Sequence, residues 1–173
     1  MKTNFSQGRN WITSAINDVN IIINSLKRKF YSIVAFRCQF SIVKFNKSLL
    51  SLMGVKIEKM HNPSKILREL IHDEKVFNLS KNHKNLFELN IKFSEFFEEQ
   101  GTITRYGVLE ADQIKFPEDI YHSLEKVREF IKNLFNYLEN FLEILKQTFN
   151  ITESQFEDLK KLKKQLKKLK KWT

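Results

Sequence analysis

The sequence predicts an all-α protein: an up-and-down bundle of four to five helices, followed by an extra basic helix at the C-terminus. Apolar residues recur at three- and four-residue steps through most of the chain, as in helices with one buried face. The 173 residues include only 4 Gly and 2 Pro, too few for the many turns of a β-sandwich. Hydrophobic residues make up 42%, with 16 Phe, so the chain can bury a core.

Two helices open the chain. The first begins near Gly8 and ends in the basic run 27–29, whose charge suits the negative end of a helix dipole. The second starts at Phe30 and stops at Gly54, a residue favoured just after a helix. Because the turn between them is very short, we expect the two helices to pack as an antiparallel hairpin.

The middle of the chain predicts three further helices and one long loop. Asn62 and Pro63 favour the start of a short helix, and a fourth helix spans about 82–99. Residues 101–117 form an irregular stretch, and a loop of that length in a compact domain is often functional. Pro117 then opens a long helix with a continuous apolar face.

The C-terminal segment combines leucines with lysines. Residues 152–155 form a capping box for a last helix, and its leucines step by three, four and three from Leu159 to Leu169. Residues 149–173 hold eight lysines and three acidic residues, a net charge of +5. The lysines are Lys160, Lys161, Lys163, Lys164, Lys167, Lys168, Lys170 and Lys171. We divide the chain into a helical bundle at 1–149 and a Lys-rich helix at 150–173.

This basic helix has several interpretations. Its lysines suit phosphate contacts without sequence preference, its leucines suit a coiled coil, and a membrane-surface helix would need a larger apolar face. A leucine seam this short is not stable alone, so the helix must dock on something or fray. The alternative to all three functions is a solvated helix that docks by its leucine stripe.

The net charge indicates the kind of partner the protein binds, and the cysteine count indicates its cellular compartment. A net charge of +10 and a pI of about 9.6 favour an acidic partner: nucleic acid, nucleotide phosphates, an anionic membrane or an acidic protein. Cys38 is the one cysteine, so no intrachain disulfide forms. The start of the chain has no signal-peptide pattern, and no run reaches the roughly 18 apolar residues of a transmembrane segment. We expect a cytoplasmic protein.

Several short sequence patterns occur in the same order along the chain as in one known protein family. The run Trp11-Ile12-Thr13-Ser14-Ala15-Ile16-Asn17-Asp18-Val19 is similar to W-L-x-x-A-x-x-D-L. Phe30 to Gln39 and Lys47 to Leu50 are similar to the family's second helix, residues 61–70 to its H-x-x-x-x-L-L-x-x-L, and Arg105-Tyr106 to its R-Y loop. Over about residues 8–148 the chain resembles the HEPN family (higher eukaryotes and prokaryotes nucleotide-binding domain). It departs from the pattern at Phe40, Val43 and Gly107.

The resemblance implies a helical bundle, usually a homodimer. Many HEPN members are encoded beside a minimal nucleotidyltransferase in toxin–antitoxin pairs, and others are metal-independent ribonucleases that use an Arg and a His separated by four to six residues. No Arg of this chain has a His at that spacing. Arg68 and His72, four positions apart, are weak catalytic candidates, with a solvated helix face as the alternative.

The preferred binding candidates are Arg105 and Tyr106, because Arg holds phosphate bidentately and Tyr stacks on a base. The alternative is that Tyr106 packs on the bundle while Arg105 pairs with a carboxylate such as Glu110. Arg37, Lys44 and Lys47 lie along one side of the second helix, either lining a basic cleft or forming ordinary surface.

No cofactor or metal is expected. The four histidines (His61, His72, His83 and His122) do not cluster, there is no cysteine pair, and no Gly-rich phosphate loop is present. Cys38 lies among apolar residues, as expected of a buried thiol.

Three function hypotheses follow. The leading one is a homodimeric binding module for a nucleotide, RNA or a nucleotidyltransferase, one half of a toxin–antitoxin pair and not an enzyme. The first alternative is a ribonuclease toxin with an irregular site. The second is a structural oligomer assembled through its basic helix.

Overall fold

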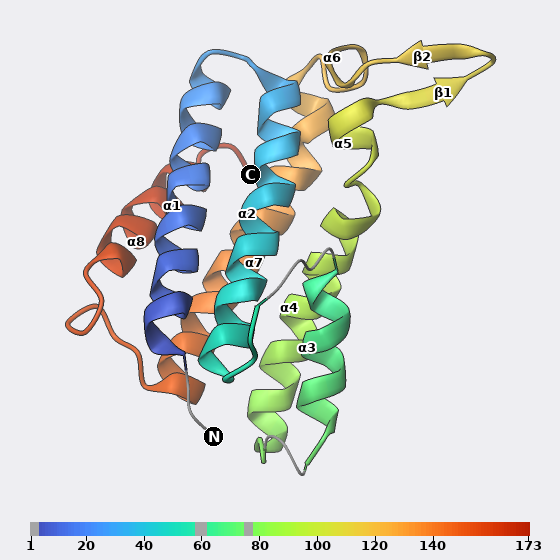
Figure 1. Ribbon diagram of the computed structural model, residues 1–173. Helices are drawn as coiled ribbons and strands as arrows, with labels where there is room; N and C mark the ends of the chain where they lie inside the picture. Colours follow the sequence, from blue (N-terminus) through green and yellow to red (C-terminus); the bar gives the residue numbers. More distant parts are fainter. Residues whose placement is uncertain (1–3, 58–61, 75–77) are drawn as a thin grey trace.

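The computed structural model describes residues 4–57, 62–74 and 78–173, and it confirms the all-α class (Figure 1). Helices α1 (Phe5–Lys27) and α2 (Tyr31–Leu52) form the expected antiparallel pair and lie side by side along most of their length. The first helix begins before Gly8 because the Asn4 side chain caps it, accepting a hydrogen bond from the Gln7 amide at 3.2 Å. Helix α2 ends at Leu52, just before Gly54 at φ +82°.

The turn from α1 to α2 uses a lysine where a glycine is usual. The Phe30 amide donates to the Ser25 carbonyl at 2.9 Å, and Lys29 between the helices has φ +61°. A left-handed conformation costs an L-residue with a side chain about 1–2 kcal/mol, because its Cβ crowds the following carbonyl.

Replacing Lys29 by Gly should therefore stabilise the protein. Relief of the left-handed conformation outweighs the extra flexibility of glycine in the unfolded chain, and we expect a gain of about 0.5–1 kcal/mol. Urea unfolding of K29G measures it. Asn150→Gly is the matched control, because Asn150 is also left-handed (φ +54°) but Asn tolerates that region, so the gain should be smaller. A less stable K29G would contradict this reading of the turn.

Helices α3 (Pro63–His72) and α4 (Lys81–Glu99) pack against each other beside this pair. Pro63 occupies the first turn of α3, as expected from the sequence, and the Ser80 hydroxyl accepts a hydrogen bond from the His83 amide at the start of α4. The Ser64 amide and hydroxyl both donate to the Glu98 carboxylate, which ties the two helices together at one end. Burial raises the pKa of Glu98, and these two hydrogen bonds act against that rise.

The prediction of an irregular stretch at 101–117 is wrong. The chain forms helical turn α5 (Ile103–Tyr106), strand β1 (Val108–Glu110), strand β2 (Gln113–Lys115) and helical turn α6 (Pro117–Ile120). The two strands are antiparallel, with Leu109 opposite Ile114, and this hairpin projects from the end of the bundle (Figure 1). Its turn places Ala111 and Asp112 at φ +47° and +63°, a conformation that Asn-Gly usually marks in a sequence.

Gly107 makes the join between α5 and the hairpin. Its φ is +80°, and a Cβ at this position would lie 1.9 Å from the Lys115 carbonyl oxygen. Only glycine fits this backbone conformation without a clash, so the departure from the family pattern at Gly107 is explained by the hairpin that follows it.

The long helix also starts later than predicted. Pro117 opens only the short α6, and Ser123 is extended (φ −140°) before α7 (Leu124–Phe149) begins. The core lies where α7 crosses α2 and α4: Phe45, Tyr137 and Phe141 are fully buried and pack ring against ring. The Tyr137 hydroxyl donates to Asn46, which donates to Ser94, so these three buried polar side chains are paired with one another.

The last helix, α8 (Asp158–Leu169), docks on its own chain. It begins later than the capping box suggests: the Thr152 amide donates to the Gln155 side chain at 2.9 Å, but this bond closes a turn before the helix. Its four leucines are buried, mostly against α1. The Gln165 amide donates to the Ile16 carbonyl at 3.2 Å, and the Thr13 hydroxyl to Asp158 at 2.7 Å. None of the helices in the described part of the chain combines the length and the apolar composition of a transmembrane segment.

Candidate nucleic-acid interface

One side of α2 carries cations and an aromatic ring over residues 37–47. Arg37, Phe40, Lys44 and Lys47 follow one another at steps of three, four and three, which places them in one row on a helix. Neighbouring elements complete this surface, which we call the basic face. It consists of Arg37, Phe40, Lys44 and Lys47 of α2, Trp11 and Asp18 of α1, and Arg105 of α5.

Asp18 holds two of the cations. Its side chain is 3% exposed, and its two oxygens accept from Arg37 Nη1 at 2.9 Å and Lys44 Nζ at 2.5 Å. A buried carboxylate needs such partners, and each of these hydrogen bonds is charge-assisted. Asp18 therefore fixes the Arg37 and Lys44 side chains in place, while both remain partly exposed to solvent.

Aromatic rings lie beneath the cations. The Phe40 centroid is 5.4 Å from Lys44 Nζ and 5.4 Å from the Arg105 guanidinium carbon, and Lys47 Nζ is 4.9 Å from the Trp11 centroid. These distances lie within the range of cation–π attraction. Phe40, a departure from the family pattern, thus joins a cation of α2 to one of α5.

The charge of this face is positive. Across residues 4–57, 62–74 and 78–173, no carboxylate pairs with Lys47 or Arg105, so the face holds four cations and one carboxylate, that of Asp18, which pairs with Arg37 and Lys44. Desolvation lowers the pKa of Lys47, and the positive charge of Lys44 lowers it further. An anion bound between these two lysines would relieve that repulsion.

Arg105 links the basic face to a hollow beside it. Its guanidinium donates to the Gln39 side chain at 3.1 Å, so the alternative that it pairs with Glu110 is wrong; Glu110 pairs with Lys115. The hollow has a volume of about 500 Å³. Its lining is Ser32, Ile33, Phe36, Thr104, Arg105, Tyr106, Phe116, Pro117 and Glu118. Tyr106 is 71% exposed, so the alternative that it packs on the bundle is also wrong.

Comparison with protein families decides the identity of the chain. The model of the HEPN domain matches residues 9–147, which include the whole basic face. The chain belongs to the HEPN family. HEPN domains are nucleotide-binding and ribonuclease-type modules. Comparisons with curated proteins and with solved structures give no match.

The weak catalytic candidates of this HEPN chain lie away from the basic face, on α3. Arg68 Nη1 lies 2.5 Å from Glu95 Oε1, and His72 Nε2 lies 2.7 Å from Glu88 Oε1, so both bind carboxylates of α4. The hydrogen bonds that Arg68 donates to the Glu95 carboxylate raise the pKa of Arg68. Both side chains thus tie α3 to α4, and the structure does not bring them to the other candidate residues.

The described histidines and Cys38 lie outside the basic face. In the part of the chain that the structure describes, no three His, Cys, Asp or Glu side chains could hold a metal ion together; His61 lies outside that part. Cys38 is fully buried, and burial raises its pKa. It stays a protonated thiol at neutral pH.

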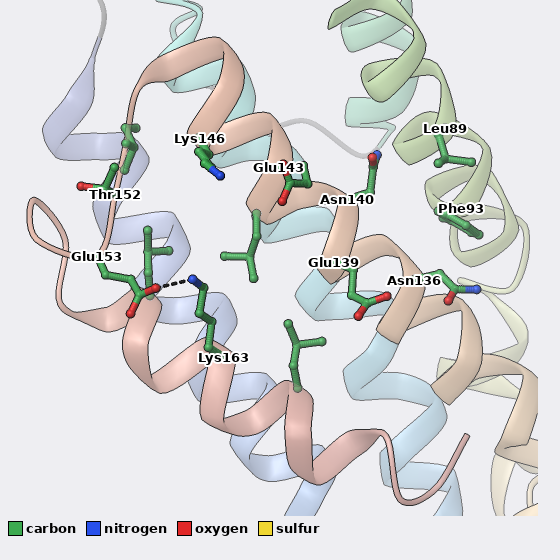
Figure 2. Close-up of a pocket in the computed structure, with 14 residues that line it drawn as sticks. Leu89, Phe93, Asn136, Glu139, Asn140, Glu143, Lys146, Thr152, Glu153 and Lys163 are labelled. Atoms are coloured by element: carbon green, nitrogen blue, oxygen red, sulfur yellow. Dashed lines mark hydrogen bonds and ion pairs between the residues drawn. The ribbon is translucent and has the colours of Figure 1, made fainter. Parts of the chain in front are cut away.

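The lysines of α8 form a second basic surface, entirely beyond the HEPN match at residues 9–147. Their side chains are exposed, and two of them are paired: Lys161 with Asp158 at 2.8 Å, and Lys163 with Glu153. Figure 2 shows the larger hollow of about 830 Å³ between α4, α7 and α8. Because Glu139, Glu143 and Glu153 line it against two lysines, it is a poor phosphate site, and we place the candidate interface on the basic face.

Sequence reasoning found four of the residues at this interface but missed their partners. Arg37, Lys44, Lys47 and Arg105 were predicted from their positions on the second helix and in the R-Y loop. Trp11 and Asp18 enter the sequence analysis only as members of the family-like run 11–19, with no role assigned to either. The available signal was the motif that contains both, where an acidic residue occurs on an otherwise apolar helix face.

Proposed function

We propose that this HEPN chain binds single-stranded RNA, with its phosphates on the basic face. The observation that supports this proposal is the basic face, where four cations lie beside aromatic rings with one carboxylate among them; the cations are Arg37, Lys44, Lys47 and Arg105. Cations neutralise phosphates, and aromatic rings give bases a surface on which to stack. Nucleotide binding, the general function of HEPN domains, agrees with this chemistry.

The proposal does not require catalysis. The usual spacing of Arg and His in HEPN ribonucleases does not occur in this sequence, and Arg68 and His72 are engaged with carboxylates. Homodimerisation, a nucleotidyltransferase partner and a role in a toxin–antitoxin pair extend the same proposal. They rest on the family alone.

Neutralising the basic face should weaken RNA binding. In Arg37→Gln/Lys47→Gln/Arg105→Gln, three phosphate contacts are lost, and we expect the Kd for a fluorescent single-stranded RNA to rise at least about tenfold near physiological salt. The log–log salt slope should become shallower by about 2, at roughly −0.7 per contact. Fluorescence anisotropy over a salt series measures both quantities.

The matched control removes the same charge from α8. Lys160→Gln/Lys164→Gln/Lys168→Gln loses three exposed lysines that form no ion pair with any described residue, and its Kd and salt slope should change little. The reverse ranking would place the RNA on α8. RNA that shortens during the assay in EDTA, but not with His72→Ala, would favour the ribonuclease alternative instead.

A further inference from the structure

Six of the exposed large apolar side chains gather at the hairpin end of the bundle. They are Phe30, Ile33, Tyr106, Leu109, Ile114 and Phe116, and their exposed fractions range from 40% to 71%. Three of them, Ile33, Tyr106 and Phe116, line the 500 Å³ hollow that Arg105 joins to the basic face. A concave site with exposed aromatic rings beside a cation has the composition of a ligand site.

The aromatic residues that line this hollow offer surfaces on which a flat ring can stack. Tyr106 and Phe116 are 71% and 58% exposed, so each offers a free ring face, and Phe36 in the same lining is half-buried. Bases stack on such rings whatever their identity. A ligand phosphate would meet Arg105, which belongs to both the hollow and the basic face. A base seated here would therefore belong to an RNA strand that runs along α2.

The polar group that could select the base is Glu118. It is the acidic residue that lines the hollow, and the described residues give it no ion pair. An ionised carboxylate only accepts hydrogen bonds, with two oxygens side by side. Guanine offers two adjacent donors, N1–H and the N2 amine, on its Watson–Crick edge. Adenine, cytosine and uracil each place at least one acceptor next to their donor, which a carboxylate repels.

We propose that the hollow is a guanine subsite, in which the base stacks on Tyr106 and Phe116 and donates two hydrogen bonds to Glu118. This inference rests on the proposed RNA binding and adds its base preference. The subsite makes the chain select RNA with a guanosine at one position, whereas the basic face alone binds any sequence.

The test compares hexauridylate with the same RNA carrying one internal guanosine, adenosine or cytidine. By anisotropy, the guanosine probe should bind wild type about tenfold more tightly than the other three, the usual size of one bidentate contact to a base. Glu118→Gln should abolish this preference, because the amide presents a donor to a guanine donor. Glu125→Gln, which removes an exposed carboxylate outside the hollow, should keep it.

A second pair of variants tests the stacking. Tyr106→Ala should weaken binding of the guanosine probe about 5- to 100-fold, and Tyr106→Phe should retain the wild-type affinity because it keeps the ring. Equal affinity for all four probes, or a preference that Glu118→Gln leaves intact, would overturn the guanine subsite while RNA binding stands. Absence of binding to every probe would overturn both proposals.

The exposed rings also suit contact with a second copy of the chain. Analytical sedimentation of the same variants distinguishes a guanine subsite from an interface between copies. We expect Tyr106→Ala and wild type to have the same mass. A wild-type dimer that becomes a monomer in Tyr106→Ala, with unchanged RNA affinity, would make this patch an interface between copies and would overturn the subsite.

Discussion

Phe45→Ala should lower the free energy of unfolding by about 3–5 kcal/mol, the usual cost of removing a buried phenyl ring. The Phe45 side chain is fully buried, with its ring centroid 4.7 Å from that of Phe141 and 6.2 Å from that of Tyr137. The surrounding helices hold this space open, so the deletion leaves a cavity. Urea unfolding followed by circular dichroism measures the change.

Phe30→Ala is the control for this effect. The same ring is deleted, but Phe30 is 50% exposed at the start of α2, so we expect less than about 1 kcal/mol. Equal losses in the two variants would mean that α2 does not pack on α7 through Phe45. Since α2 carries the basic face on its other side, a destabilised Phe45→Ala should also lose RNA affinity at denaturant concentrations that wild type tolerates.

Leu162→Asp should detach α8 and cost about 3–5 kcal/mol. Leu162 is fully buried against the bundle, and a carboxylate there would be desolvated without a partner. An isolated helix of 12 residues is marginal in water, so the detached segment should unfold. We expect trypsin to remove the segment faster than in wild type, together with a lower midpoint of urea unfolding.

Lys164→Asp introduces the same carboxylate on the exposed side of the same helix. It should keep both the midpoint and the protease resistance close to those of wild type. If Leu162→Asp behaved like this control, the leucine stripe of α8 would not be its docking surface. RNA binding through the basic face should survive detachment of α8, because none of its residues lies on α8.

Helix periodicity was sufficient to predict most of this fold. The apolar rows of the first two helices, Pro63 at the start of α3 and Gly54 after α2 all mark real boundaries. The hairpin escaped prediction because strands of three residues are too short to show alternation, and because Ala111-Asp112 is not a typical hairpin turn.

The site was predictable only one residue at a time. Steps of three and four placed Lys44 and Lys47 on one side of α2, but their position relative to Asp18, Trp11 and Arg105 depends on how three elements pack. The sequence also left open where α8 docks, because a stripe of leucines fits equally well on its own bundle or on a partner. Its contacts with Ile16 and Thr13 of α1 are tertiary and have no local signal.

Helix α2 thus has two roles in this HEPN protein. One side, with Phe45 and Asn46, anchors it to α4 and α7. The other presents cations whose positions Asp18, Trp11 and Phe40 help to fix. A cation held in place before binding loses less conformational entropy when a phosphate arrives. The rigidity of the bundle therefore contributes directly to the proposed binding of RNA.

Ultraviolet crosslinking of the protein to uniformly labelled oligouridylate, followed by mass spectrometry of the crosslinked peptides, tests the location of the RNA most directly. We expect the crosslinks in peptides that contain Trp11, the 36–47 segment of α2 and Tyr106, because bases must lie against those rings for the reaction to occur. Crosslinks confined to residues 158–173, with none on these three segments, would contradict the account and move the RNA to the lysines of α8.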